Sequence, residues 1–498
     1  MRAVQPANKA FVEKPSPVRL RLPPSPASAT AFTHLQLRCH LIFDSVLERV
    51  ATGWGERDGG GFVGAVWRPS PGKRGVFLHD RLVCASGHGL RVRRLGGNRA
   101  GEIRLTRFLR NTNVSPEEMA ASAAQRLGER SAGRHVVAIQ DTTVLQSEGG
   151  GGLYLHVCLA LDGQDGTILG LADAALLKRD KGRKEARRAL PTAAKESQRW
   201  LDGAEAAAQA CARARELTLV ADRESDIYAA FASRPAGAHM VVRAAQDRAL
   251  DDGGLLFGKI DALPEAGRAH LDLPAKPGRS ARQATLAVRF MRVNLKRPAN
   301  SVDLGLAKSL SLTMVDVREV DPPAGEKVHW RLLTTYDIAN TQAALGIADL
   351  YRRRWAIEQL FRTMKTQGFD VEGLRIEDET ARCNLAVAAL IAAVTVQQLV
   401  HARDGNADAG PLRPIIDAFE AEDAPLLEAL CAKLEGKTER QKNPHPKGSL
   451  AYASWVCARL GGWTGYYGKP GPIVMLHGWF EFQSAKRGVN AMQSLKDV

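Results

Sequence analysis

The sequence lacks closely spaced cysteines and long apolar runs, and these absences exclude several classes of protein. Its seven cysteines form no CxxC pair of the kind that a zinc site or a redox motif needs. No run of about 18 uncharged apolar residues is present, so no membrane span is expected. The first thirty or so residues alternate basic residues with proline instead of forming an apolar signal core. A soluble intracellular protein with reduced thiols is indicated.

Acidic residues are also in deficit. The chain holds 54 Asp and Glu against 69 Lys and Arg, which gives a formal net charge of +15 over 498 residues. This excess of positive charge favours a polyanionic partner, most simply nucleic acid, without separating DNA from RNA. The length predicts two or three domains.

Sequence patterns divide the chain into segments of different character. Residues 1–95 are rich in Pro, Gly and Arg, lack sustained periodicity and are expected to be poorly ordered. In a helical lead-in over 96–134, Ser115 is the predicted cap of a helix that starts at Pro116. Beyond it, the patterns predict an α/β core in two parts, a β-rich insertion and a helical C-terminal region. The bounds of these four segments are 135–238 and 339–405 for the core, 239–338 for the insertion and 406–498 for the C-terminal region.

Two predicted strands of the core end in a carboxylate. An apolar run from His135 ends at Asp141, and a strand over 217–221 leads directly to Asp222. Between them, 153–161 and 167–177 flank a turn and predict antiparallel strands. Any one aspartate at a strand end is more often a cap or turn residue, so neither is diagnostic alone.

A third acid, Glu358, lies in a helix predicted over 343–367, ahead of an apolar helix over 380–403. Acids at strand ends can converge, and carboxylate oxygens suit Mg²⁺. Two such ions can activate the attacking oxygen and stabilise the leaving oxygen of a phosphodiester. The three acids together therefore predict a divalent metal site.

A polar stripe is predicted around Glu358. Tyr351, Arg354, Glu358 and Lys365 are spaced by three, four and seven residues, which places them within about 60° of one another around one helix. Glu358 would face metal while the basic residues face phosphate. A solvated charged face gives the same pattern. A neighbouring arc of four apolar residues would anchor the helix to a core: Ile357, Leu360, Phe361 and Met364.

This signature resembles that of the bacterial cut-and-paste DDE transposases of insertion-sequence-four type, which include the transposon-five transposase. The Tyr-x2-Arg-x3-Glu-x6-Lys pattern is matched without a gap. Residues 139–143 and 221–228 resemble the blocks around the two catalytic aspartates of the family. The likeness extends over about residues 100 to 490, through further blocks at 107–115, 195–200 and 458–463. By this resemblance, the catalytic metal-binding triad is Asp141, Asp222 and Glu358.

The resemblance implies a fold and an activity. The fold is an α/β ribonuclease-H-like core with a β-rich insertion and a helical C-terminal region. The activity is cleavage at transposon ends and strand transfer, driven by two Mg²⁺ ions per site, with Mn²⁺ as a substitute. The implied partners are double-stranded DNA, both transposon ends and target, and a second copy of the chain in a homodimer. The implied location is the nucleoid in the bacterial cytoplasm.

The resemblance also implies roles for five DNA-binding residues. Arg354 and Lys365 would hold transposon-end phosphates, with Tyr351 supporting the same network. Trp330 would stack on a base flipped out of the duplex, although a core Trp on a strand fits equally well. Arg243 would contact the DNA backbone, where a solvated arginine closing a strand is the alternative.

Several features leave alternatives open. Residues 1–95 lack the basic segment that announces the family's end-recognition domain, so a degenerate DNA-binding copy or a metal-dependent nuclease without strand transfer are alternatives. Glu224 and Asp226 lie near Asp222 and are interpreted as structural. The basic run over 178–188 tracks a DNA backbone or forms a solvated helix face.

Overall fold

The computed structural model of the chain describes most residues from Val92 onward. The expectations for residues 1–91, and for all of the basic run over 178–188 except Lys178 at the end of β3, lie outside the described part. The described ranges are 92–96, 98–145, 153–178, 190–273, 280–323, 327–365, 368–373, 376–405, 412–466 and 468–496.

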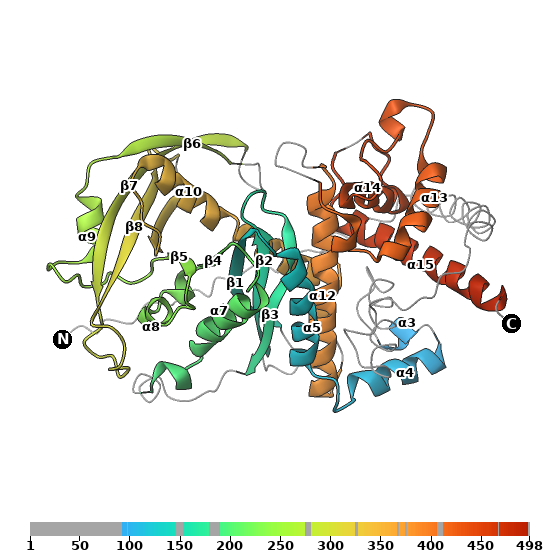
Figure 1. Cartoon of the computed structure of the whole chain (residues 1–498), viewed down its shortest axis with the longest axis horizontal. Helices are drawn as coiled ribbons and strands as arrows, with labels where there is room; N and C mark the ends of the chain where they lie inside the picture. The colour runs from blue at the N-terminus through green and yellow to red at the C-terminus, as the bar shows by residue number, and fades with distance from the viewer. Residues whose placement is uncertain are drawn as a thin grey trace, which may run out of the picture.

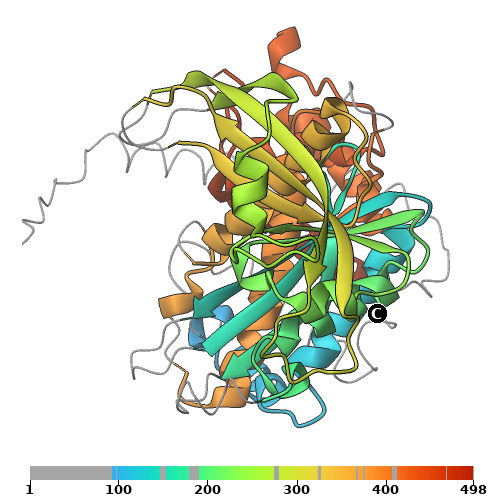
Figure 2. The same ribbon diagram turned by 90° about the vertical axis from the view of Figure 1, so that its left-hand side faces the viewer.

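One mixed sheet of nine strands organises the described part of the chain (Figures 1 and 2). Its strand order is β3-β2-β1-β4-β5-β9-β8-β7-β6. The strands are β1 (His135–Leu145), β2 (Leu153–Asp162), β3 (Ile168–Lys178), β4 (Glu216–Ala221), β5 (Ala238–Arg243), β6 (Gly267–Leu273), β7 (Arg282–Lys296), β8 (Ser309–Glu319) and β9 (His329–Thr334).

The first five strands form the ribonuclease-H-like part of the sheet. β1, β2 and β3 pair antiparallel, as the turn signals predict, and β4 and β5 run parallel to β1. Almost all of β5 lies within the segment 239–338 that was predicted as a β-rich insertion, but the strand pairs in parallel with β4. The predicted α/β class and ribonuclease-H-like core are confirmed.

The β-rich segment extends the same sheet. β9 pairs antiparallel with β5, so that Val242 faces Leu333, and β8, β7 and β6 follow in turn toward the far edge. The insertion is therefore continuous with the core through backbone hydrogen bonds.

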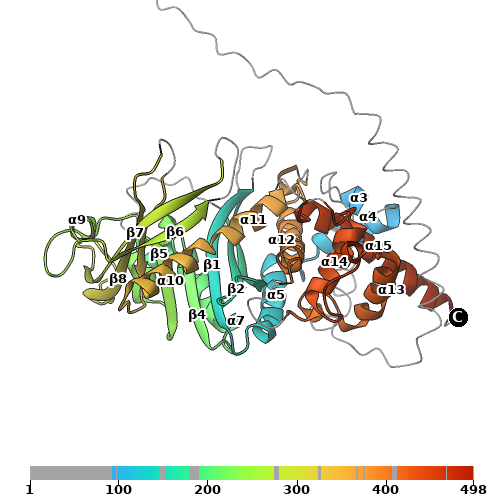
Figure 3. The ribbon, with the colours of Figure 1, turned by 90° about the horizontal axis from the view of Figure 1, so that it is seen from above.

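Each face of the sheet carries its own apolar core. Successive side chains of a strand point to opposite faces, and in β1 Val137 and Ile139 join one core while Val136 and Ala138 join the other. The first core is covered mainly by α5 (Pro116–Arg130), α10 (Thr341–Arg352), α11 (Trp355–Lys365) and α12 (Glu379–Ala402) (Figure 3). The second is covered by α7 (Gln198–Ala210), α8 (Tyr228–Ala232) and α9 (Leu256–Asp261).

Local signals placed the start of α5 correctly. Ser115 has extended backbone angles, and its hydroxyl accepts a hydrogen bond from the Glu118 amide with Pro116 in the first turn. This is the cap that the sequence predicts. Two further helices precede α5, namely α3 (Val92–Gly96) and α4 (Arg99–Leu109).

The sequence predicted a single helix over 343–367. This prediction is wrong, because the segment forms two helices. α10 ends at Arg352 and α11 begins at Trp355, and the amides of Arg354 and Ala356 each bond to the carbonyl three residues earlier. The break is held by Arg353, whose guanidinium donates to the Asp162 carbonyl oxygen at 2.8 Å. A distant partner on the β2–β3 turn thus overrides helix propensity.

α12 stands between the sheet and the C-terminal helices (Figure 1). It is the one helix in the described ranges that is apolar and long enough to cross a membrane, and 78% of its apolar window is buried inside the protein.

The C-terminal region holds α13 (Ala424–Leu434), α14 (Leu450–Leu460) and α15 (Pro472–Lys496). Short 3-10 turns occur at Thr192–Ala194, Arg223–Ser225, Val371–Gly373, Ile415–Asp417, Ala421–Asp423 and Glu439–Gln441.

Five cysteines in the described part of the chain have free thiols. They are Cys158, Cys211, Cys383, Cys431 and Cys457. Cys39 and Cys84 lie outside the described residues.

The contact between α14 and α15 depends on glycine. A Cβ on Gly478 would lie 1.6 Å from the Cys457 carbonyl oxygen. Gly478→Ala is therefore expected to lower the free energy of unfolding by about 1–3 kcal/mol or more, measured by urea denaturation. Gly346→Ala is the control, because no atom lies within 4 Å of that Cβ. It should be neutral or stabilising by up to about 1 kcal/mol, and equal losses in both variants would contradict this account.

Candidate active site

The register of β1 against β4 brings two aspartates together. The last parallel pair is Gln140 with Ala221, and the next residue on each strand is Asp141 and Asp222. Asp222 follows β4 directly, as predicted. Asp141 does not end its strand, because β1 continues to Leu145 through its antiparallel pairing with β2. It stands instead where the parallel pairing stops.

The third acid reaches the same place from α11, and one guanidinium joins all three. Arg354 donates to Asp141 at 2.9 Å through Nη1 and to Glu358 at 2.5 Å through Nη2. Its Nη2 also lies 3.8 Å from an oxygen of Asp222. The structure therefore brings Asp141, Asp222 and Glu358 together around Arg354.

Burial and like charge disturb the ionisation of Asp141. Burial raises the pKa of its carboxyl to about 6, with smaller upward contributions from Asp222 and Glu358. The Thr142 amide, which donates to Asp141 at 2.8 Å, and the Arg354 guanidinium act in the opposite direction. A shifted acid beside two other acids is typical of a functional site.

Tyr351 and Trp330 line one side of the acids. The Tyr351 hydroxyl donates to Asp222 at 3.1 Å, and burial raises the pKa of this phenol, with Asp222 adding to the shift. The Trp330 ring lies 6.0 Å from the Tyr351 ring, half-buried and packed against the core. Trp330 is therefore near the site and also a packing residue.

Lys365, the last residue of α11, contacts β1 three residues beyond Asp141. Its ammonium donates to the Val144 carbonyl oxygen at 2.5 Å and pairs with Glu372 at 2.9 Å. Four residues of α11 that were expected to anchor the helix are buried, as predicted: Ile357, Leu360, Phe361 and Met364.

Arg243 lines a basic pocket next to Asp222. One of its nitrogens lies 4.0 Å from the Asp222 carboxylate, and another donates to the His329 carbonyl oxygen at 3.1 Å. The pocket has a volume of about 390 Å³ and also contains Arg223, Arg331 and the Phe257 ring. Three guanidinium groups thus face one space beside the acids.

A hydrogen-bonded chain behind the two aspartates was not anticipated from the sequence. Arg199 donates to the Thr142 hydroxyl at 3.1 Å and pairs with Glu224 at 2.8 Å. Thr142 bonds to Nδ1 of the buried His156 at 2.9 Å, and Nε2 of that ring bonds to the Gln140 side chain at 3.1 Å. Arg199 therefore ties the residue after Asp141 to the turn after Asp222. Its place in the family-like block over 195–200 was the available signal.

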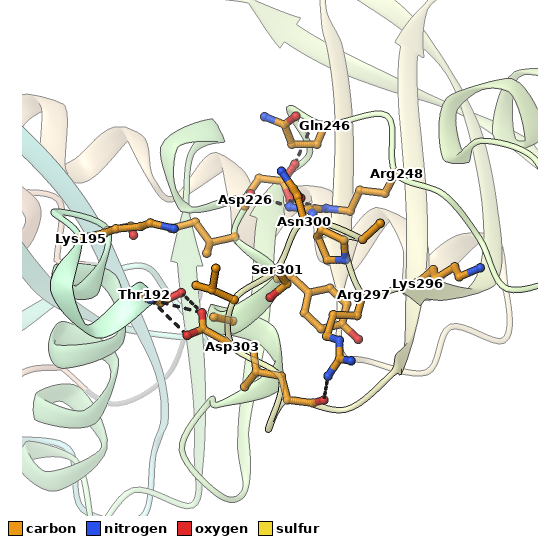
Figure 4. Close-up of a pocket in the computed structure, with 18 of the residues that line it drawn as sticks. Thr192, Lys195, Asp226, Gln246, Arg248, Lys296, Arg297, Asn300, Ser301 and Asp303 are labelled. Atoms are coloured by element: carbon orange, nitrogen blue, oxygen red, sulfur yellow. Dashed lines mark hydrogen bonds and ion pairs between the residues drawn. The ribbon is translucent and has the colours of Figure 1, made fainter. Parts of the chain in front are cut away.

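Asp226 has a structural role, as expected. Its fully buried carboxylate accepts from the amides of Ala245 and Gln246 and pairs with Arg248 at 2.6 Å. The interaction fixes the loop after β5 and forms one wall of a cavity of about 1220 Å³ (Figure 4). On another wall, the Thr192 hydroxyl donates to Asp303 at 2.5 Å.

A second residue missed by the sequence interpretation is Trp355. This first residue of α11 is 51% exposed, and the Arg362 guanidinium lies 5.0 Å from the ring centroid. In the sequence, Trp355 lies inside the matched signature, directly after Arg354. Nothing else in the sequence indicated that its ring is exposed.

The three acids fit a divalent cation in chemistry, since carboxylate oxygens are the ligands that hard cations prefer. In the described residues, no group of three Asp, Glu, His or Cys side chains is arranged closely enough to hold a metal ion. The Arg354 guanidinium lies within 4 Å of all three carboxylates and separates them.

His156 predicts an acid-sensitive stability. Burial lowers the pKa of its imidazole from 6.5 to about 3, so the unfolded chain binds a proton below pH 6.5 that the folded chain does not. Stability is then lost as pH falls, by roughly 2 kcal/mol at pH 5. His156→Gln should remove this part of the pH dependence in urea denaturation between pH 7.5 and 5. An unchanged slope would contradict the assignment of a neutral buried imidazole.

Comparison with known families agrees with the fold. The family model for the transposase DDE domain matches residues 136–394, which span β1 through most of α12 and include Asp141, Asp222 and Glu358. Transposase DDE domains act on DNA and in general use divalent metal ions. Because the match covers more than half of the chain, this protein belongs to the DDE transposase family.

Proposed function

We propose that the protein is a cut-and-paste DNA transposase of insertion-sequence-four type. The observation that carries the proposal is the convergence of three carboxylates from β1, the end of β4 and α11 on one point. The matched Tyr-Arg-Glu-Lys spacing supports the type, because all four residues lie beside this point or on the same helix.

Asp141, Asp222 and Glu358 are proposed to hold Mg²⁺, or Mn²⁺ in its place, as two ions per site. When bound, such ions activate the attacking oxygen and stabilise the leaving oxygen of a phosphodiester. The protein supplies the ligands on rigid elements: hydrogen bonds between β1 and β4 fix the two aspartates, and buried α11 side chains fix Glu358. Thr142 and Tyr351 hold two of the carboxylates in orientation through hydrogen bonds.

Basic residues near the acids are proposed to bind phosphates of the transposon end. Arg354 and Lys365 lie on the segment that carries Glu358, and the Tyr351 hydroxyl, just before that segment, bonds to Asp222. Arg243 extends this basic surface into the pocket with Arg223 and Arg331. Arginine is suited to this role because its fork of donors matches phosphate oxygens.

Trp330 is proposed to stack on a base displaced from the duplex. Its half-buried ring lies near Tyr351, so a displaced base would lie close to the acids. Aromatic stacking of this kind stabilises a flipped nucleotide without reading its sequence.

The remaining assignments concern assembly and domain organisation. The chain is proposed to act as a homodimer on DNA in the bacterial nucleoid, with contacts through the C-terminal region. The proposed division places a catalytic core at 135–238 and 339–405, a β-rich insertion at 239–338 and a C-terminal region at 406–498.

Cleavage of DNA tests the proposal. Purified protein with Mg²⁺ should cut a duplex that carries the terminal repeats of its own element, at the repeat boundary. Glu358→Ala should lower the rate by at least about a thousandfold, because one carboxylate ligand is lost. Glu224→Gln is the matched control, since this acid lies near Asp222 but pairs with Arg199, and it should stay within about tenfold of wild type.

Two other results would overturn the proposal. Cleavage that depends on Glu358 but is equally fast on a duplex with scrambled repeats would show a nuclease without end recognition. Binding of the repeats with no cleavage in any metal would show a degenerate copy.

A further inference from the structure

Arg354 is held in the middle of the acidic triad. Its side chain is only 15% exposed, and its two terminal nitrogens contact Asp141 at 2.9 Å, Glu358 at 2.5 Å and Asp222 at 3.8 Å. Three carboxylates gathered in a half-buried space repel one another, and a single guanidinium compensates one of the three charges. The arginine therefore acts as the counter-ion of the site.

The same arrangement competes with metal binding. A divalent cation such as Mg²⁺ needs carboxylate oxygens at about 2.0–2.1 Å, and one oxygen of Asp141 and one of Glu358 already accept hydrogen bonds from Arg354. The guanidinium also carries a positive charge that repels a second cation at short range. A metal ion can bind to all three acids only when the guanidinium has left them.

A phosphate group offers Arg354 another partner. Arg354 lies in the short break between α10 and α11, where residues 353 and 354 are outside either helix. A guanidinium binds phosphate through two parallel hydrogen bonds, as strongly as it binds a carboxylate. DNA that enters the site brings this anion, and the triad then loses its internal cation.

We propose that Arg354 is a counter-ion that DNA removes, so that the triad binds divalent metal tightly only after a DNA phosphate has taken the guanidinium. The proposal rests on the proposed function, because it takes the three acids as the metal ligands. Under this proposal, the Arg354 side chain determines that DNA binds before the metal ions. In the absence of DNA, the protein holds little metal at the triad.

Thermodynamic linkage gives the proposal a measurable form. If DNA raises the affinity for metal by some factor, metal must raise the affinity for DNA by the same factor. Couplings between two sites are typically about 5–150-fold. Removing the guanidinium should bring the ratio of metal affinities with and without DNA close to one. The carboxylates are then free to bind metal in both conditions.

The test measures Mn²⁺ binding to the full chain by titration calorimetry and by electron paramagnetic resonance of free Mn²⁺. Wild type is compared with Arg354→Gln, alone and with a duplex whose scissile phosphate is replaced by a non-cleavable analogue. Arg352→Gln is the matched control, because this exposed arginine lies two residues from Arg354 but pairs with Asp349 at 3.2 Å and not with the triad. It removes the same charge without freeing the triad. Circular dichroism confirms that each variant is folded.

The expected result is that duplex tightens Mn²⁺ binding to wild type and to Arg352→Gln by about tenfold or more. Arg354→Gln should bind Mn²⁺ tightly in both conditions. Equal affinities for wild type and Arg354→Gln without duplex would overturn the role of Arg354 while leaving the triad in place. Absence of Mn²⁺ binding in every sample, with or without duplex, would instead overturn the metal-binding triad itself.

Discussion

The parallel pairing of β1 with β4 is the constraint on which the site depends. Its last hydrogen-bonded pair, Gln140 with Ala221, sets the position of the next residue on each strand, and those residues are acids. A shift of register by one residue would turn one carboxylate to the opposite face of the sheet. The apolar residues buried on both faces of β1 hold this register, so the cores support the geometry of the carboxylates.

Ion pairs and hydrogen bonds of arginine side chains place the third acid, Glu358, beside the two aspartates. Arg354 is pulled in by three acids, while Arg353 beside it is held by the β2–β3 turn. The two neighbouring arginines thus interrupt the helix and direct Glu358 toward the aspartates. Behind them, Arg199 connects the two aspartate-bearing segments. The arginine side chains in this region therefore fix the backbone as well as the carboxylates.

The sequence predicted the features that depend on local pattern. Asp222 at a strand end, the Ser115 cap and the apolar arc of α11 follow from periodicity and capping, and the structure confirms them. The helix break at Arg353 and the chain of contacts through His156 depend on partners far away in the sequence, which periodicity does not contain. The same reason explains why Asp141 lies inside a longer β1, since pairing with β2 extends the strand.

The continuity of the nine-stranded sheet has a mechanical consequence. β9, which carries Trp330, pairs directly with β5, and β5 pairs with β4, which is followed directly by Asp222. The aromatic ring and the acids therefore belong to one stiff body, with no hinge between them. A duplex that contacts both must bend and unstack, so the structural distortion takes place in the DNA and not in the protein. Base steps that deform easily, such as TA or CA, would lower this energy and favour one position of cleavage.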